Sequence, residues 1–275
     1  MQRIRQPRVA ELVASRLRED ILSGHLREGD VLPSQENLLT EFQVSPPALR
    51  EAIHILEADG LISVRRGNLG GAVVHLPSAQ RTAHLISMVL QARAATPADI
   101  SMALMHLEPI CAGMCAARED RITEVVPYLE EAIQTQISES DDPSTYVPNA
   151  RRFHEVLVSR CGNEPMILVI GSLELIWSSH ESLVWSDDAG LDSPAAQKTQ
   201  RAALRDHQRL LEAIRDGNGL RATRLAQDHL AVARRNTLAY GKDTTIQAKL
   251  ITNPDQPFRL TRAAPDDRDG RSIEK

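Results

Sequence analysis

The stretch "LPSQENLLTEFQVSPPALREAIHILEADGLISVRRGNLGGAVV", residues 32–74, contains the local signals that decide the fold of the N-terminal part of the chain. The segment "SQENLLTEF" predicts a short helix with Ser34 as its N-cap, and "QVS" after it is a three-residue turn. A second helix is expected from Pro46 to Asp59. Gly60 then stands where helices commonly end in the left-handed conformation.

Two adjacent prolines, Pro46 and Pro47, open this second helix. They are tolerated there because the N–H groups of a first helical turn have no partner within the helix. Ser45 is predicted to cap the helix by accepting a hydrogen bond from a free backbone N–H group. The prolines stiffen the helix entry, and Arg50 follows one turn later, where an arginine can bind a guanine edge or a phosphate.

The flanking segments complete a small domain. "LISVRRGNLGGAVVHL" predicts a β-hairpin with a glycine-rich tip, and "RVAELVASRLREDILSG" before the stretch has apolar residues at helical spacing. Three helices and a hairpin indicate a winged helix-turn-helix, which we assign to residues 1–76. The second helix of such a pair enters the major groove of DNA. We therefore predict DNA contacts from Ser34, Ser45, Pro46, Pro47, Arg50, Arg65, Arg66, Gly67 and Asn68.

The remaining sequence predicts helices only. Residues 77–240 are assigned to an antiparallel helical bundle of about seven segments, roughly 79–94, 97–118, 121–139, 145–162, 165–184, 194–216 and 219–240. The fold class is therefore mostly α. Residues 241–275 are polar and contain three prolines, so we expect a mobile tail there.

Composition limits the classes of protein that this chain can belong to. The net charge of −5 over 275 residues excludes a basic coat for nucleic acid, so a DNA-binding surface must be local. Three cysteines cannot all pair within one chain, which is typical of a reducing compartment. We find no signal peptide and no stretch of about 20 apolar residues, and therefore expect a soluble cytoplasmic protein without a membrane partner.

Residues 32–74 resemble the DNA-binding domain of GntR-type bacterial transcription regulators. The shared motifs are L-P-S at 32–34, V-S at 44–45, R-E-A at 50–52, L-E-x-x-G-L at 56–61 and a glycine-ended wing at 65–71. The resemblance implies a homodimer on a two-fold DNA operator. Glu36 and Pro46 stand where the family usually has arginines. Each lost bidentate guanine contact removes about 1–3 kcal/mol of discrimination, so we expect an operator different from the common family palindrome.

Two further segments, "RRFHEVLVSRCGNEPM" and "HQRLLEAIRDGNGLRATRLAQDHL", resemble the FCD effector-binding domain of the fatty-acid-regulator branch of that family. The resemblance implies a divalent metal, zinc or nickel, bound by an aspartate and three histidines, with a small carboxylate effector against it. The matching histidines are His154, His207 and His229. Ala150 stands in place of the aspartate, so the expected metal ligands are the three histidines without a carboxylate.

A second departure concerns the effector. Many family members have an effector-binding arginine four residues before the glutamate that corresponds to Glu108, and here that position is Leu104. From these departures we expect a less polar or larger effector, such as an acyl ligand. The predicted effector site consists of Leu104, Glu108, Ala150, His154, His207 and His229.

The spacing of two of the histidines supports a shared site without the family. His207 lies eleven residues before Asn218, in the "DGNG" turn, and His229 lies eleven residues after it. Eleven residues are close to three helical turns, so an antiparallel hairpin brings both imidazoles to the same height.

The leading interpretation is a ligand-responsive transcription repressor that is not an enzyme. One alternative is a metal-dependent hydrolase that uses the three histidines, with the DNA-binding domain as an appendage. It lacks an obvious general base, since Glu155 points about 100° away from His154 on the helix. A second alternative is a nonspecific architectural DNA binder, against which the net charge of −5 argues.

Overall fold

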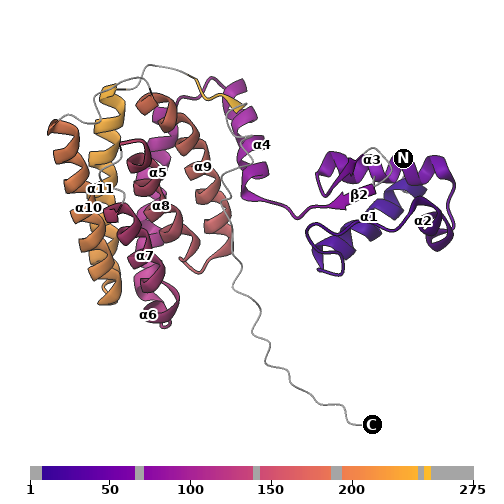
Figure 1. The fold of residues 1–275 in the computed structure, drawn as a ribbon, viewed down its shortest axis with the longest axis horizontal. Helices are drawn as coiled ribbons and strands as arrows, with labels where there is room; N and C mark the ends of the chain where they lie inside the picture. The colour runs from indigo at the N-terminus through magenta and orange to yellow at the C-terminus, as the bar shows by residue number, and fades with distance from the viewer. Residues whose placement is uncertain (1–7, 66–70, 139–142, 187–193, 241–244, 249–275) are drawn as a thin grey trace, which may run out of the picture. The chain divides into compact units, whose positions relative to one another are not determined.

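The computed structural model describes residues 8–65, 71–138, 143–186, 194–240 and 245–248, and the chain forms two compact units, Met1–Ser78 and Ala79–Lys275 (Figure 1). The first unit contains α1 (Val9–Leu22), α2 (Gln35–Phe42), α3 (Pro46–Asp59), β1 (Ile62–Arg65) and β2 (Gly71–Val74). The second contains α4 (Ala79–Ala92), α5 (Pro97–Ala117), α6 (Arg121–Glu124), α7 (Val126–Ser138), α8 (Pro143–Ser159), α9 (Glu164–Ser186), α10 (Pro194–Arg215) and α11 (Gly219–Tyr240). The mostly helical fold class is confirmed.

The first unit is a winged helix-turn-helix. The apolar stripe of α1, which includes Val13 and Leu17, is buried against α3. Ser34 caps α2 as predicted, accepting a hydrogen bond from the N–H of Asn37 at 3.3 Å. Helix α3 ends at Gly60, whose φ of 71° is the left-handed conformation that favours glycine.

The cap predicted for α3 is wrong in one respect. Ser45 has the extended backbone of an N-cap, but its side chain makes no capping hydrogen bond. Caps usually accept from the N–H of the second or third helical residue, and Pro47 at the second position has none. The two prolines thus define the helix start by their fixed φ, and the Ser45 residue stays exposed.

The wing is an antiparallel hairpin in which Ile62 pairs with Val74 and Arg65 pairs with Gly71. An isolated bridge between Val31 and Val73, which we did not predict, extends this sheet. A Cβ atom on Gly71 would lie 2.7 Å from the Val31 side chain, so glycine is required for this close approach.

The second unit is an antiparallel helical bundle in which α5 and α11 pack closely together. Glycines make this approach possible. A Cβ atom on Gly113 would lie 2.4 Å from the Thr223 hydroxyl, and one on Gly219 would lie 3.2 Å from the Gly113 carbonyl oxygen. This contact positions α11, which carries His229, against the centre of the bundle.

The helix predicted for residues 121–139 is divided into α6 and α7 at Val125. Pro127 explains the break, because its ring has no N–H to donate and clashes with the carbonyl four residues earlier. The other six predicted segments of the bundle each correspond to one helix.

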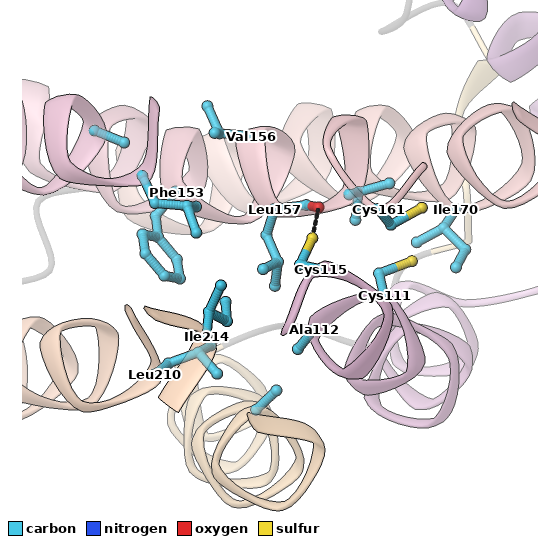
Figure 2. Packing of buried hydrophobic residues seen from close by; sticks show 14 of the residues in the cluster. Cys111, Ala112, Cys115, Phe153, Val156, Leu157, Cys161, Ile170, Leu210 and Ile214 are labelled. Atoms are coloured by element: carbon cyan, nitrogen blue, oxygen red, sulfur yellow. Dashed lines mark hydrogen bonds between the residues drawn. The ribbon is translucent and has the colours of Figure 1, made fainter. Parts of the chain in front are cut away.

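Helix α5 is long and apolar enough to cross a membrane by composition, contrary to our reading that no such segment exists. It lies in the core of the bundle, where Ala112, Cys111 and Cys115 are buried (Figure 2). The Cys115 thiol donates to the Leu157 carbonyl oxygen at 3.2 Å, which ties α5 to α8. The core helix of a soluble protein can have the same length and apolar composition, so α5 is weak evidence for a membrane span.

The expectation of a polar tail outside the bundle does not hold for residues 245–248. Ile246 is fully buried within the same core as the bundle helices, and Ala248 is also buried. The remaining tail residues, 241–244 and 249–275, lie outside the described residues.

Candidate functional site

The predicted DNA-contacting residues that the structure describes all lie on the surface of the first unit. Ser45, Pro46 and Pro47 are exposed at the start of α3, and Arg50 is exposed on its next turn. The Arg50 Nε donates to the Pro46 carbonyl oxygen at 3.4 Å, within its own helix. Ser34 and Arg65 are also exposed. Arg66, Gly67 and Asn68 lie outside the described residues.

In the second unit, three histidines from three different helices meet in the bundle interior. His154 lies on α8, His207 on α10 and His229 on α11, and all three are buried. The Nε2 atom of His229 is 3.2 Å from that of His207 and 3.3 Å from that of His154. The predicted convergence of the hairpin histidines across the turn therefore holds.

A different polar group holds the Nδ1 atom of each imidazole. Glu108 Oε1 lies 2.5 Å from His154 Nδ1, and Gln136 Oε1 lies 2.9 Å from His207 Nδ1. Asp206 Oδ2 lies 3.6 Å from His229 Nδ1. Glu108 and Gln136 present oxygen atoms at hydrogen-bond distance, so we infer that His154 and His207 carry their protons on Nδ1 and turn their Nε2 lone pairs toward His229.

Burial disfavours the charged form of two of the three imidazoles, those of His154 and His207. Burial lowers the pKa of His207 well below its ordinary value, and the neighbouring histidines lower it further. Burial also lowers the pKa of His154, although Glu108 opposes this. Burial raises the pKa of Glu108, but its interactions with His154 and Arg151 outweigh burial and leave that pKa below its usual range.

Converging lone pairs repel one another unless a cation lies between them. The donor atoms of His154, His207 and His229 all lie within 4.8 Å of one another, as the ligands of one metal ion must. Imidazole nitrogens suit zinc, nickel, copper or iron, and oxygen partners on the Nδ1 atoms are the usual support of metal-binding histidines. The residues present therefore fit a divalent metal.

The other predicted effector residues have different surroundings. Glu108 belongs to the site through His154, but Leu104 is buried in the apolar core of the bundle. Ala150 is half-buried one turn before His154 on α8. Its methyl group provides no metal ligand, so the fourth ligand of a tetrahedral metal would have to come from a group other than residue 150.

A buried ion pair that the sequence analysis missed lies beside the histidines. Arg151 on α8 contacts Glu174 on α9, and both side chains are buried. The positive charge of Arg151 acts on His154, His207 and Glu108, which places it in the electrostatic neighbourhood of the site. An arginine is therefore present near the histidines, although not at the family position that Leu104 occupies.

Two atoms at the site have unused hydrogen-bonding capacity. Glu108 Oε2 and Gln136 Nε2 are buried and have no hydrogen-bond partner within the described residues. A buried polar atom without a partner is costly, by about 1–3 kcal/mol. An acceptor and a donor are thus available to a molecule that enters this site.

Sequence signals existed for only some of the missed residues. Arg151 precedes His154 by three residues, which puts both on one helix face. Asp206 is adjacent to His207 in sequence, yet it supports His229 on the neighbouring helix. Gln136 carries no sequence signal, because 71 residues separate it from the histidine that it contacts.

Replacing Gln136 with leucine is expected to lower zinc affinity about 10–100-fold, the usual effect of losing a partner of a metal-binding histidine. The variant removes the acceptor that fixes the His207 tautomer. Gln136→Glu keeps an acceptor and should retain most of the affinity. Calorimetric zinc titration measures both, with the exposed Gln134→Leu on the same helix as control. Equal affinity in Gln136→Leu and wild type would show that Gln136 does not position His207.

Comparisons with known proteins find matches for both units of the chain. Residues 9–73 match the model of the bacterial regulatory proteins of the gntR family, and residues 99–232 match that of the FCD domain. The chain is 25% identical over 240 residues to the HTH-type transcriptional repressor NanR of Klebsiella aerogenes, covering 86% of this chain and 87% of the relative. It is also 25% identical over 242 residues to NanR of Escherichia coli K12, with 86% and 87% covered.

Among solved structures, a GntR protein of Streptococcus agalactiae is similar, with a TM-score of 0.63 and 21% identity. The match covers 82% of this chain and 99% of that chain. At this identity the likeness concerns the fold.

Proposed function

Because the chain belongs to the gntR family of bacterial regulatory proteins and contains an FCD domain, we propose that it is a ligand-responsive, DNA-binding transcription repressor. Relatives named as HTH-type transcriptional repressors match it over most of their length. The observation that carries the ligand-responsive part is the convergence of three buried histidines in the helical unit.

The DNA-binding role is assigned to the first unit. Arg50 and the exposed start of α3 are the base-reading elements, and Arg65 on the wing contacts phosphate. A pair of such units in a homodimer would read a two-fold operator. The protein would act in the cytoplasm, where its DNA is.

The second unit is proposed to bind a divalent metal through His154, His207 and His229. A bound metal would supply a Lewis-acid centre to which an oxygen atom of an effector can attach. Glu108 and Gln136 hold His154 and His207 in the tautomer that ligates, and Asp206 lies beside His229. Burial lowers the pKa of His154 and of His207, which favours their neutral, ligating forms.

The charges at the site indicate the chemistry of the effector. Three carboxylates, Glu108, Glu174 and Asp206, would together balance a divalent cation and Arg151, so the site needs no further charge from the effector. Two buried atoms, Glu108 Oε2 and Gln136 Nε2, have no hydrogen-bond partner among the described residues. We therefore infer an effector whose polar groups can donate to Glu108 Oε2 and accept from Gln136 Nε2.

The alternative functions are not favoured. A hydrolase would need a general base near the metal, and the candidate Glu155 is engaged by Arg152 at 3.5 Å. A nonspecific architectural binder would not need a second unit with a buried polar site.

The test of the proposed function is a footprint on the DNA upstream of the gene for this protein and of its neighbours. We expect protection of a two-fold site and a steep loss of affinity when one half-site is scrambled. Uniform binding to all fragments, with a strong salt dependence, would instead identify a nonspecific binder.

A further inference from the structure

A short C-terminal segment, residues 245–248, is bonded to helices that lie far from it in sequence. Three consecutive backbone N–H groups of this segment each have an acceptor. Ile246 donates to the Ala95 carbonyl oxygen at 2.9 Å, and Ala248 donates to Gln91 Oε1 at 3.0 Å. Between them, Gln247 donates to His180 Nε2 at 2.9 Å.

Side chains complete this attachment. His84 Nδ1 lies 3.2 Å from the Ala248 carbonyl oxygen, to which it donates. Ile246 is fully buried and joins the apolar core shared with Ala83 on α4 and Ile100 on α5. The segment therefore binds α4 and the α4–α5 connection on one side and α9 on the other, as its position beside α4 in Figure 1 illustrates.

His180 is prepared to accept from this segment. Its Nδ1 atom donates to the Ile176 carbonyl oxygen at 2.8 Å, one turn earlier on α9, which leaves the Nε2 lone pair for the Gln247 N–H. Burial lowers the pKa of His180, so the imidazole stays neutral and keeps that lone pair. The buried imidazole of His180 thus accepts a hydrogen bond from the backbone N–H group of Gln247.

Both parts of this attachment lie outside the segments that match the family models. The gntR-family match covers residues 9–73, and the FCD match covers residues 99–232. Helix α4, residues 79–92, and residues 245–248 fall in the unmatched parts. Helix α4 also begins directly after Ser78, where the DNA-binding unit ends. Contacts that hold α4 in place therefore also hold the residue at which the chain leaves the DNA-binding unit and enters the helical unit.

We propose that residues 245–248 form a strap that locks α4 onto α9 and makes α4 a rigid mount for the DNA-binding unit. With the strap in place, two DNA-binding units in a dimer start from defined positions, which favours simultaneous contact with both half-sites. With the strap released, α4 keeps its packing on α9 but loses the bonds at Gln91, Ala95 and His84. Only the predicted effect of the strap on operator binding depends on the proposed function.

The test compares two strap variants with a matched control. Ile246→Ala removes the buried anchor, and His180→Phe removes the acceptor while keeping an aromatic ring. Gln247→Ala is the control, because it changes a half-buried strap side chain and keeps the backbone bond. Hydrogen exchange of peptides from α4 and α11, measured by mass spectrometry on the full chain, reports on the lock. We expect about tenfold or faster exchange in α4 for both strap variants, and unchanged exchange in α11 and in the control.

A second experiment measures the affinity of each variant for a DNA duplex with the full two-fold site and for a duplex with one half-site. The strap variants should lose about tenfold in affinity for the full site and little for the half-site, because only simultaneous binding depends on a fixed mount. If hydrogen exchange in α4 were as slow in both strap variants as in the wild type, residues 245–248 would not lock α4 onto α9. If α4 exchanged faster but the ratio of full-site to half-site affinity stayed the same, α4 would be locked by the strap but would not serve as a mount for the DNA-binding unit. If the wild type itself bound neither duplex specifically, the proposed function would fail, and the role as a mount would fail with it.

Discussion

Replacing Arg50 with alanine is expected to abolish specific operator binding while both units stay folded. The side chain is exposed on the second turn of α3, after Pro46 and Pro47, which are the first two residues of that helix. A bidentate arginine–guanine contact contributes about 1–3 kcal/mol of discrimination. The two half-sites together then contribute about 2–6 kcal/mol, which corresponds to a loss of roughly 30-fold to 20,000-fold in operator affinity.

The expected effect is large because this chain has few arginines available for base reading. Glu36 and Pro46 occupy the positions of the family's other helical arginines, so Arg50 has no equivalent on α2 or α3 among the described residues. Its bond to the Pro46 carbonyl oxygen, 3.4 Å long, lies within its own helix and can be exchanged for a base contact.

Fluorescence anisotropy with the footprinted operator and a scrambled duplex measures this loss. The control is Arg16→Ala, an exposed arginine on α1 that is already paired with Asp20 at 3.3 Å. Arg65→Ala on the wing should weaken binding to all sequences evenly and reduce the salt slope by about one per contact. Unchanged specific affinity in Arg50→Ala would remove α3 as the reading helix, and a loss at one base position in Arg65→Ala would make the wing a base reader.

Replacing His207 with alanine is expected to lower zinc affinity by roughly 100-fold or more. Structural zinc sites with four ligands bind with about 10–16 kcal/mol, which is about 3 kcal/mol per ligand. His207 is also stacked on Phe153, with ring centroids 4.1 Å apart, so the imidazole is held in place before any metal binds. Little reorganisation is therefore needed on binding.

Ala150→Asp tests the same site in the opposite direction. The new carboxylate would stand one turn before His154 on α8 and add a negatively charged oxygen ligand. We expect zinc affinity to rise about tenfold or more, and binding of a carboxylate effector to weaken because its place is taken. Calorimetric titration of both variants, with the exposed His106→Ala as control, provides the measurement. If neither His207→Ala nor Ala150→Asp changed zinc affinity in folded protein, the three histidines would not form a metal site.

Much of the fold could be predicted from the sequence because its signals are local. Ser34, Gly60 and the paired prolines act on backbone groups within a few residues, so they mark helix ends without knowledge of the tertiary structure. The convergence of His207 and His229 could also be predicted, since a tight turn and the helical repeat fix their relative height.

The local sequence signals predicted the structure less well at two places where a proline changed what its neighbours could do. Ser45 stands at an N-cap, but Pro47 removed one of the donors that it would have capped. Pro127 was hidden within a helical pattern that it interrupts. In both cases the covalent geometry of proline outweighed the preference of the surrounding residues.

The polar environment of the site and the strap were decided only by the tertiary structure. Gln136 meets His207 across 71 residues, and Gln247 meets His180 across 67. Such contacts depend on how buried helices pack, and packing is set by the combined shape of many apolar side chains rather than by any short motif. The sequence by itself determined a winged helix followed by a helical unit in which His207 and His229 lie at the same height. Only the packed bundle determined that His154 meets them and that Glu108 and Gln136 orient His154 and His207, because a buried polar group must find its partner wherever the fold brings one.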